Sequence, residues 1–268
     1  LYAGQVFLTP ATQASKALID AVATDVEAAL GPDPRRAQLR LSPASFFHKF
    51  GALRRTLYLS ARYHEHSRAV MASLGFDPDA MAFDPLRARV ILHAGHEDPR
   101  AAAVYYPHRD TWYGHPQSLI NWWLPLDDLA HEETFEFYPE YFERPIANDS
   151  EVFDYAAWVA QGWSLKIGWQ DRDAGLKAAY PGVIGEPNRG RRVEFACKRA
   201  ETLLFAGAHL HATRPQALGR SRFSVEFRAA HLGDYAAGRG APNVDDRSRG
   251  SSVSDYLHPG QTDWSEGS

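Results

Sequence analysis

Residues 222–228 read Arg222-Phe-Ser-Val-Glu-Phe-Arg228, a strict alternation of polar and apolar side chains. A period of two is typical of a β-strand, so the apolar residues share one face and the polar residues share the other. A charged row on one strand is usually a solvated face. Here the arginine and serine lie at a fixed spacing after a histidine, which favours an interior face where a guanidinium and a hydroxyl, Arg222 and Ser224, hold a carboxylate.

That histidine lies in a run with the pattern of a turn, an apolar strand and a second strand: Ala200-Glu-Thr-Leu-Leu-Phe-Ala-Gly-Ala-His-Leu-His211. His211 precedes Arg222 by eleven residues, and His209 precedes Arg220 by the same offset. Both histidines have the same strand parity, so both stay open as ligands. We choose His211 because Arg222 begins the alternating strand, whereas Arg220 lies in a Gly-Arg-Ser turn.

A second motif, His108-Arg109-Asp110, lies about a hundred residues earlier. On a strand His108 and Asp110 point the same way, while Arg109 points away. Taken alone, such a triplet is more often a surface pair. With one distant histidine it forms the ligand set of the two-His-one-carboxylate facial triad, which holds Fe(II) and leaves positions open for other ligands.

The rest of the pattern predicts a mainly β protein with flanking helices. One helix is expected from Thr9-Pro10 to Gly31-Pro32, and a second from about Leu53 to Leu74. Strands are expected at 87–93, 103–108, 118–124, 192–196, 202–206 and 222–228. We expect one domain, with a helical part over 1–84, a β core over 85–230 and a C-terminal tail over 231–268.

An insertion at about 127–192 interrupts the strands and is expected to contain a helix that starts near Asp149-Ser150. A segment this long between strands is more often a lid or a binding wall than a plain connector. The last 30 residues lack periodicity and are expected to lie on the surface.

Composition narrows the class of protein further. The chain has 268 residues, 44% of them apolar and 12% aromatic, and a formal charge of −4. It has no basic stripe for nucleic acid and no apolar run near the roughly 20 residues of a membrane span. Cys197 is the only cysteine, which fits a reducing compartment, so a cytoplasmic location is expected.

The combination His108-x-Asp110, His211 and Arg222-x-Ser224 resembles the Fe(II)/2-oxoglutarate-dependent dioxygenases over roughly residues 85–230. The resemblance implies a double-stranded β-helix, also called a jelly roll or cupin-like fold. It implies that His108, Asp110 and His211 bind Fe(II), and that Arg222 and Ser224 hold the distal carboxylate of 2-oxoglutarate. With O₂, such enzymes form succinate and CO₂ as they hydroxylate, desaturate or cyclise a substrate; a carboxylate at Asp110 disfavours halogenation.

Two branches of the superfamily are similar in particular stretches. The run His211-Ala-Thr-Arg-Pro-Gln216 resembles the H-x-x-x-P-N motif of phytanoyl-CoA-dioxygenase-like enzymes, except that Gln216 stands where Asn is usual. The runs His108-Arg-Asp-Thr-Trp-Tyr113 and Asn121-Trp-Trp-Leu-Pro125 resemble hydroxylases of the lipopolysaccharide sugar acid Kdo. Either branch implies a small-molecule substrate.

Strand parity also suggests which residues contact small molecules. Asn121 is assigned to the cofactor, and Gln117, Arg89 and Arg228 to the substrate. The two arginines favour an anionic metabolite, such as an amino acid or a sugar acid in a biosynthetic pathway. Other histidines, among them His93, His96 and His115, are expected to be loop or surface residues.

Two alternatives remain. One is a jelly-roll binding or sensing protein whose metal site is degenerate, for which Asp110→Ala would have no effect. The other is a cupin-type metalloenzyme that does not use 2-oxoglutarate and would tolerate Arg222→Ala.

Overall fold

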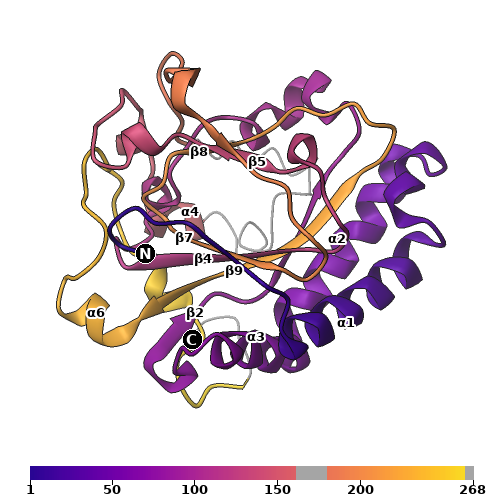
Figure 1. Ribbon diagram of the computed structural model, residues 1–268, viewed down its shortest axis with the longest axis horizontal. Helices are drawn as coiled ribbons and strands as arrows, with labels where there is room; N and C mark the ends of the chain where they lie inside the picture. Colours follow the sequence, from indigo (N-terminus) through magenta and orange to yellow (C-terminus); the bar gives the residue numbers. More distant parts are fainter. Residues whose placement is uncertain (161–179, 263–268) are drawn as a thin grey trace.

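The computed structural model describes residues 1–160 and 180–262 and contains two antiparallel sheets (Figure 1). The larger sheet has the strand order β1-β7-β4-β9-β2, and β3 also pairs with β9. Its strands are β1 (Phe7–Thr9), β2 (Met81–Phe83), β3 (Arg87–Ile91), β4 (Leu119–Pro125), β7 (Thr202–Ala206) and β9 (Arg222–His231). The smaller sheet has the order β6-β5-β8, made of β5 (Phe135–Phe137), β6 (Val193–Glu194) and β8 (His211–Thr213).

Three helices cover the outer face of the larger sheet: α1 (Gln13–Leu30), α2 (Pro43–Leu59) and α3 (Ala61–Ser73) (Figure 1). Their apolar side chains share one buried cluster with the alternate residues Phe223, Val225 and Phe227 of β9. Burial of this apolar area is the main stabilising contribution at that face. The apolar face predicted for residues 222–228 therefore packs under helices, and the polar face looks toward the smaller sheet.

The two sheets meet through aromatic side chains. Trp123 of β4, Phe205 of β7 and Phe135 and Phe137 of β5 belong to one buried cluster. The ring centroids of Trp123 and Phe135 lie 5.3 Å apart in an edge-on arrangement. This contact fixes the smaller sheet over one end of the larger one.

Shorter helices complete the described chain. The α-helices are α4 (Tyr155–Ala160) and α6 (Leu232–Ala236). The 3₁₀ helices lie at Pro34–Leu39, Pro78–Ala80, Gly95–Glu97, Pro99–Val104, Asp110–Tyr113, His131–Glu133, Pro139–Tyr141, Ser150–Val152, Arg189–Arg191 and Ser252–Asp255. No helix in the described ranges is both long and apolar enough to cross a bilayer.

The N-terminal part differs from the prediction in three ways. Thr12, not Thr9, caps α1, through a capping box in which Thr12 and Ser15 exchange hydrogen bonds. The helix expected over 53–74 is two helices, because Ser60 is extended and ends α2 before α3 begins. Residues 1–84 are also not purely helical, since β1 pairs with β7 and β2 pairs with β9.

The strand predicted over 103–108 is wrong for most of its length. Residues Pro99–Val104 form a 3₁₀ helix, and the segment touches a sheet only through a bridge between His108 and His211. Within the insertion, the predicted helix starts near Ser150 as expected, as a 3₁₀ turn at Ser150–Val152, but Phe153 is extended and separates this turn from α4. Residues 161–179 of the insertion lie outside the described residues.

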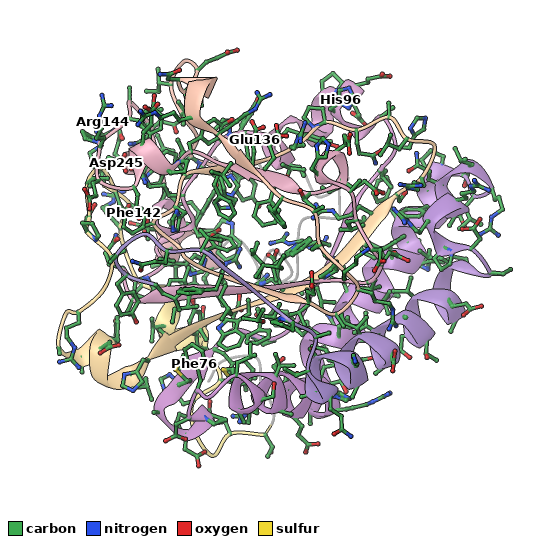
Figure 2. The ribbon with its side chains drawn as sticks, in the orientation of Figure 1. Phe76, His96, Glu136, Phe142, Arg144 and Asp245 are labelled. Carbon is green, nitrogen blue, oxygen red and sulfur yellow. The ribbon has the colours of Figure 1, made fainter. Side chains whose placement is uncertain are left out.

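The C-terminal segment is not a surface tail. Ala241, Val253, Tyr256 and Leu257 are buried, and Phe83 and Leu257 pair as an isolated bridge. The side chain of Asp245 is only 4% exposed, and Figure 2 shows Asp245 on the same side of the molecule as Phe142 and Arg144. This segment closes one end of the structure without any regular hydrophobic period, which is why its packing is absent from the sequence pattern.

Candidate metal and substrate site

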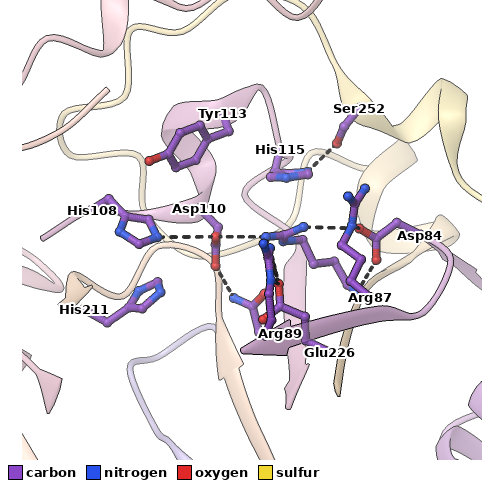
Figure 3. Close-up of polar contacts among 12 residues, drawn as sticks. Asp84, Arg87, Arg89, His108, Asp110, Tyr113, His115, His211, Glu226 and Ser252 are labelled. Atoms are coloured by element: carbon purple, nitrogen blue, oxygen red, sulfur yellow. Dashed lines mark hydrogen bonds and ion pairs between the residues drawn. The ribbon is translucent and has the colours of Figure 1, made fainter. Parts of the chain in front are cut away.

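His108 and His211 face each other across the smaller sheet's edge. Their backbones exchange two hydrogen bonds of 3.0 Å, and their ring centroids lie 4.4 Å apart. One ligand atom each from His108, Asp110 and His211 lies within 4.8 Å of the other two, a group that could hold a metal ion. Figure 3 shows the three side chains turned toward one another.

Hydrogen bonds to the backbone set which nitrogen of each ring can bind a metal. Nδ1 of His108 lies 2.8 Å from the carbonyl oxygen of Tyr106, and Nδ1 of His211 lies 3.0 Å from that of His209. Because a carbonyl only accepts, each Nδ1 carries the proton in the neutral ring and Nε2 keeps its lone pair. Burial and the neighbouring His211 lower the pKa of His108 to about 4, so its ring is neutral at pH 7.

Asp110 is buried and held at both carboxylate oxygens. Asn121 Nδ2 donates to Oδ2 over 2.6 Å, and Arg228 Nη2 lies 3.5 Å from Oδ1. Burial alone would raise the pKa of Asp110, but Arg228 and the two histidines outweigh it and hold the pKa well below its ordinary value. The carboxyl group of Asp110 is therefore ionised, as a metal ligand has to be.

His209, the alternative ligand, lies elsewhere. It is 2% exposed, and its ring centroid lies 4.5 Å from that of Phe142. Burial lowers its pKa to about 3. It does not line the cavity described below, so the structure brings His211, not His209, to His108 and Asp110.

A cavity of about 470 Å³ opens beside the three ligands, within the range of small-molecule sites. The polar face of β9 forms part of its wall through Arg222, Glu226 and Arg228. The insertion also lines it, through Phe135, Phe153, Tyr155, Trp158 and Tyr180, and so does the C-terminal segment, through Ser252, Asp255 and Tyr256. The described part of the insertion thus forms one wall of the cavity.

Arg222 and Ser224 are buried at 3% and 1% exposure. Among the described residues, Arg222 Nε and Ser224 Oγ have no hydrogen-bond partner. The guanidinium carbon lies 5.5 Å from the ring centroid of Trp123, and burial lowers the pKa of Arg222 to about 10. A buried cation beside an unused hydroxyl costs stability unless an anion joins it, so this pair fits a carboxylate.

Arg89 and Arg228, predicted as substrate contacts, line the cavity, and each is paired with an acidic side chain of the protein. Arg89 Nε donates to Glu226 Oε1 over 2.8 Å, and Arg228 Nη1 donates to Asp84 Oδ2 over 3.2 Å. Arg87 Nε donates to the same Asp84 oxygen over 3.0 Å. These residues form an ion-pair network that lines the cavity (Figure 3).

Gln117 does not line the cavity. The strand β4 begins at Leu119, so the alternation that groups Gln117 with Asn121 does not extend to it. The backbone carbonyl of Gln117 accepts a hydrogen bond of 2.9 Å from the backbone N–H of Ala241, which belongs to the C-terminal segment.

The predicted site lacked several residues of the cavity wall, among them His115 and Arg54. His115, expected on a loop or the surface, lines the cavity with Nδ1 2.5 Å from Ser252 Oγ and 3.0 Å from Tyr256 Oη. Burial, followed by Arg228, lowers its pKa well below the ordinary value. Arg54 of α2 also lines the cavity; its place on the helix next to Leu53, four residues after Phe50, was the available signal.

Fold and site together define a two-sheet β structure with a candidate mononuclear metal centre inside it. No protein-family model matches the chain, and a search of curated proteins finds no match. Similar solved structures include the non-heme monooxygenase ThoJ in its apo form, with 11% identity, a TM-score of 0.47 and coverage of 84% of this chain and 73% of that one.

Two further similar structures are described as complexes with small molecules. EvdO2 from Micromonospora carbonacea var. aurantiaca, complexed with 2-oxoglutarate, has 12% identity, a TM-score of 0.46 and coverage of 84% and 86%. The epimerase SnoN, in complex with Fe³⁺, α-ketoglutarate and nogalamycin RO, has 13% identity, a TM-score of 0.43 and coverage of 90% and 92%. Because these likenesses are weak, the residues of the site carry the functional proposal.

Proposed function

We propose that this protein is an Fe(II)- and 2-oxoglutarate-dependent oxygenase of a small polar, anionic metabolite, such as an amino acid or a sugar acid in a biosynthetic pathway. The observation that carries the proposal is the pairing of two features in one structure. Three side chains that can bind a metal, His108, Asp110 and His211, converge beside a cavity. The buried Arg222, whose Nε has no hydrogen-bond partner among the described residues, lines that same cavity. Two imidazoles and one carboxylate suit Fe(II), and the arginine suits an acid co-substrate.

The order of the strands supports a jelly roll. From β3 onward, the chain passes to the bridge at His108, then to β4, β5, β6, β7, β8 and β9. In space this gives β3-β9-β4-β7 in one sheet and His108-β8-β5-β6 in the other. We infer that these eight segments form the double-stranded β-helix, with the metal ligands on its inner side.

Each residue of the site then has a defined part. His108 and His211 would hold Fe(II) through Nε2, and Asp110 would complete the protein's share of the coordination. Arg222 and Ser224 would bind the distal carboxylate of 2-oxoglutarate, and Asn121 orients Asp110. Bound Fe(II) and 2-oxoglutarate supply the oxidising chemistry, in which O₂ is consumed and succinate and CO₂ are formed. Hydroxylation, desaturation and cyclisation are all compatible with these residues.

The test is anaerobic addition of Fe(II) and 2-oxoglutarate to the purified protein, observed through the weak visible charge-transfer band of the chelate. We expect a band in the parent and a much weaker one in Arg222→Ala. The matched control is Arg220→Ala, because Arg220 lies two residues earlier, is 43% exposed at its side chain and pairs with Glu133.

Three results would decide against the proposal. Bound iron without a band would favour the cupin-type metalloenzyme or the binding protein, and a band that survives Arg222→Ala would remove the co-substrate role of that residue. A parent that binds no Fe(II) would remove the metal centre itself.

A further inference from the structure

The helix α2 presents one side to the cavity. Pro43, Phe47, Arg54 and Tyr58 line it, at positions that recur along a single helix face. The neighbouring side of α2 packs into the buried core through four apolar residues: Phe46, Phe50, Leu53 and Leu57. Arg54 therefore lies at the edge of the core, 8% exposed, with its charge at the cavity wall.

Arg54 has no counter-ion in the described parts of the chain, unlike three other arginines of the same wall. Its Nε and Nη2 atoms are buried and have no hydrogen-bond partner among the described residues. Arg87 pairs with Asp84, Arg89 pairs with Glu226, and Arg228 pairs with Asp84 and Glu226. Asp84 and Glu226, two acids of this wall, are thus engaged with the other arginines.

The electrostatic surroundings make this charge costly. Burial, followed by Arg89 and Arg87, lowers the pKa of Arg54 to about 9, while Glu226 opposes the shift. Arg54 still carries its charge at neutral pH. An uncompensated buried cation is unfavourable by several kcal/mol in general, and removal of the charge or arrival of an anion relieves that cost.

We propose that Arg54 binds a carboxylate of the prime substrate. The Nε and Nη2 donors lie on one edge of the guanidinium, where two parallel N–H groups match the two oxygens of a carboxylate. One unpaired guanidinium balances one negative charge, which favours a carboxylate over a dianionic phosphate. The aromatic rings of Phe47 and Tyr58, on the same helix face, would contact the body of the molecule.

This assignment moves the anion site from Arg89 and Arg228, where the sequence placed it, to Arg54. It rests on the proposed function in one respect only: Arg222 is taken to be occupied by 2-oxoglutarate, so Arg54 is left for the substrate. Its test needs neither metal nor 2-oxoglutarate, so the two proposals can fail separately.

The first measurement is the unfolding temperature of the metal-free protein at constant ionic strength, with chloride replaced stepwise by acetate. The background is Arg222→Gln, which removes the other unpartnered cation. We expect acetate to raise the unfolding temperature in this background. Adding Arg54→Gln should weaken the apparent acetate affinity at least tenfold. Adding Arg55→Gln, the same change at the next and exposed position of α2, should leave it unchanged.

Each other outcome overturns the proposal. Equal responses to acetate with and without Arg54 would show that this residue binds no carboxylate. A larger response to inorganic phosphate than to acetate would replace the carboxylate with a phosphate group. No response to acetate in the Arg222→Gln background would show that the cavity holds no accessible anion site at α2.

A second variant separates an anion site from a structural role. Arg54→Met keeps the length of the side chain and removes the charge. If Arg54 waits for a ligand, this variant unfolds at a higher temperature than the ligand-free parent, because an uncompensated buried cation is gone. A lower unfolding temperature would assign Arg54 to structure and contradict the proposal.

Discussion

The side-chain amide of Asn121 donates a hydrogen bond of 2.6 Å to Asp110 Oδ2, the carboxylate of the candidate metal site. Asn121 lies on β4, the central strand between β7 and β9, whereas Asp110 begins a 3₁₀ turn. A rigid strand thus fixes the orientation of a ligand that comes from a loop. Partners of this kind tune metal affinity although they do not touch the metal.

Asn121→Ala should therefore lower the affinity for Fe(II) by about 10–100-fold, with the fold retained. Anaerobic calorimetric titration of Fe(II) measures this change. Gln117→Ala is the control, since Gln117 precedes the same strand but lies outside the cavity. Unchanged iron affinity together with weaker 2-oxoglutarate binding would instead support the cofactor contact that the sequence assigned to Asn121.

Glu226 gives the protein a predictable acid sensitivity. Burial would raise its pKa, but Arg89 and Arg228 outweigh burial and lower the pKa to about 2. A carboxyl group whose pKa is lowered by folding stabilises the folded state. This stabilisation is complete above the ordinary pKa of 4.5 and is lost as the pH falls from 4.5 toward 2. The shift corresponds to about 3 kcal/mol.

Glu226→Gln should accordingly destabilise the protein by about 3 kcal/mol at pH 7 and by about 1 kcal/mol at pH 3. Urea unfolding at pH 7, 5, 4 and 3 measures the difference in unfolding free energy between the parent and Glu226→Gln, which should decrease as the pH falls. Glu65→Gln, an exposed position on α3, should show no such trend. A difference that stays constant over this range would mean that Glu226 does not gain its stability from ionisation.

The two histidines of the run Ala208-His-Leu-His211 should behave in opposite ways. His211→Ala removes one of three ligands, and Fe(II) affinity should fall at least about 100-fold. His209→Ala leaves the ligands intact but empties a buried aromatic pocket, so it should cost about 2–4 kcal/mol of stability. Iron titration and urea unfolding of both variants separate the effects; loss of iron from His209→Ala would reverse our choice.

The sequence predicted those parts of the molecule where local pattern and tertiary role agree. Residues 222–228 alternate because one face packs under helices and the other lines a cavity, so β9 was found with its start correct. The strand Thr202–Ala206 was found with both ends correct. The His-x-Asp motif was legible because its chemistry requires fixed residue types.

The remaining parts depend on contacts that leave no period in the sequence. The helix α2 ends at Ser60, although Leu57 and Ala61 continue the helical spacing. This end could not be predicted, because no residue there is a strong helix breaker. Residues 103–108 have β-forming side chains, yet only His108 finds a partner strand. The C-terminal segment packs through a few dispersed residues such as Val253 and Tyr256, which a moving window does not detect.

Asp245 shows what that segment contributes to the site. Its carboxylate accepts from Arg109 Nη2 over 3.0 Å, from Trp112 Nε1 over 2.9 Å and from Ile146 N over 3.0 Å. Arg109 is 1% exposed and lies between the two candidate metal ligands His108 and Asp110 in the chain. Through Arg109, the C-terminal segment thus holds the loop that carries the candidate metal ligands His108 and Asp110.

Asp245→Asn should therefore destabilise the protein by about 3–5 kcal/mol, because it leaves the buried Arg109 without its counter-ion. Glu151→Gln is the matched control: it breaks the pair with Arg247, whose side chains are about half exposed, and should cost under about 1 kcal/mol. Urea unfolding compares the two. Similar small losses in both variants would show that the clamp adds no stability, whereas a large loss for Asp245→Asn alone, accompanied by weaker Fe(II) binding in the folded fraction, would establish that a segment over a hundred residues away positions His108 and Asp110.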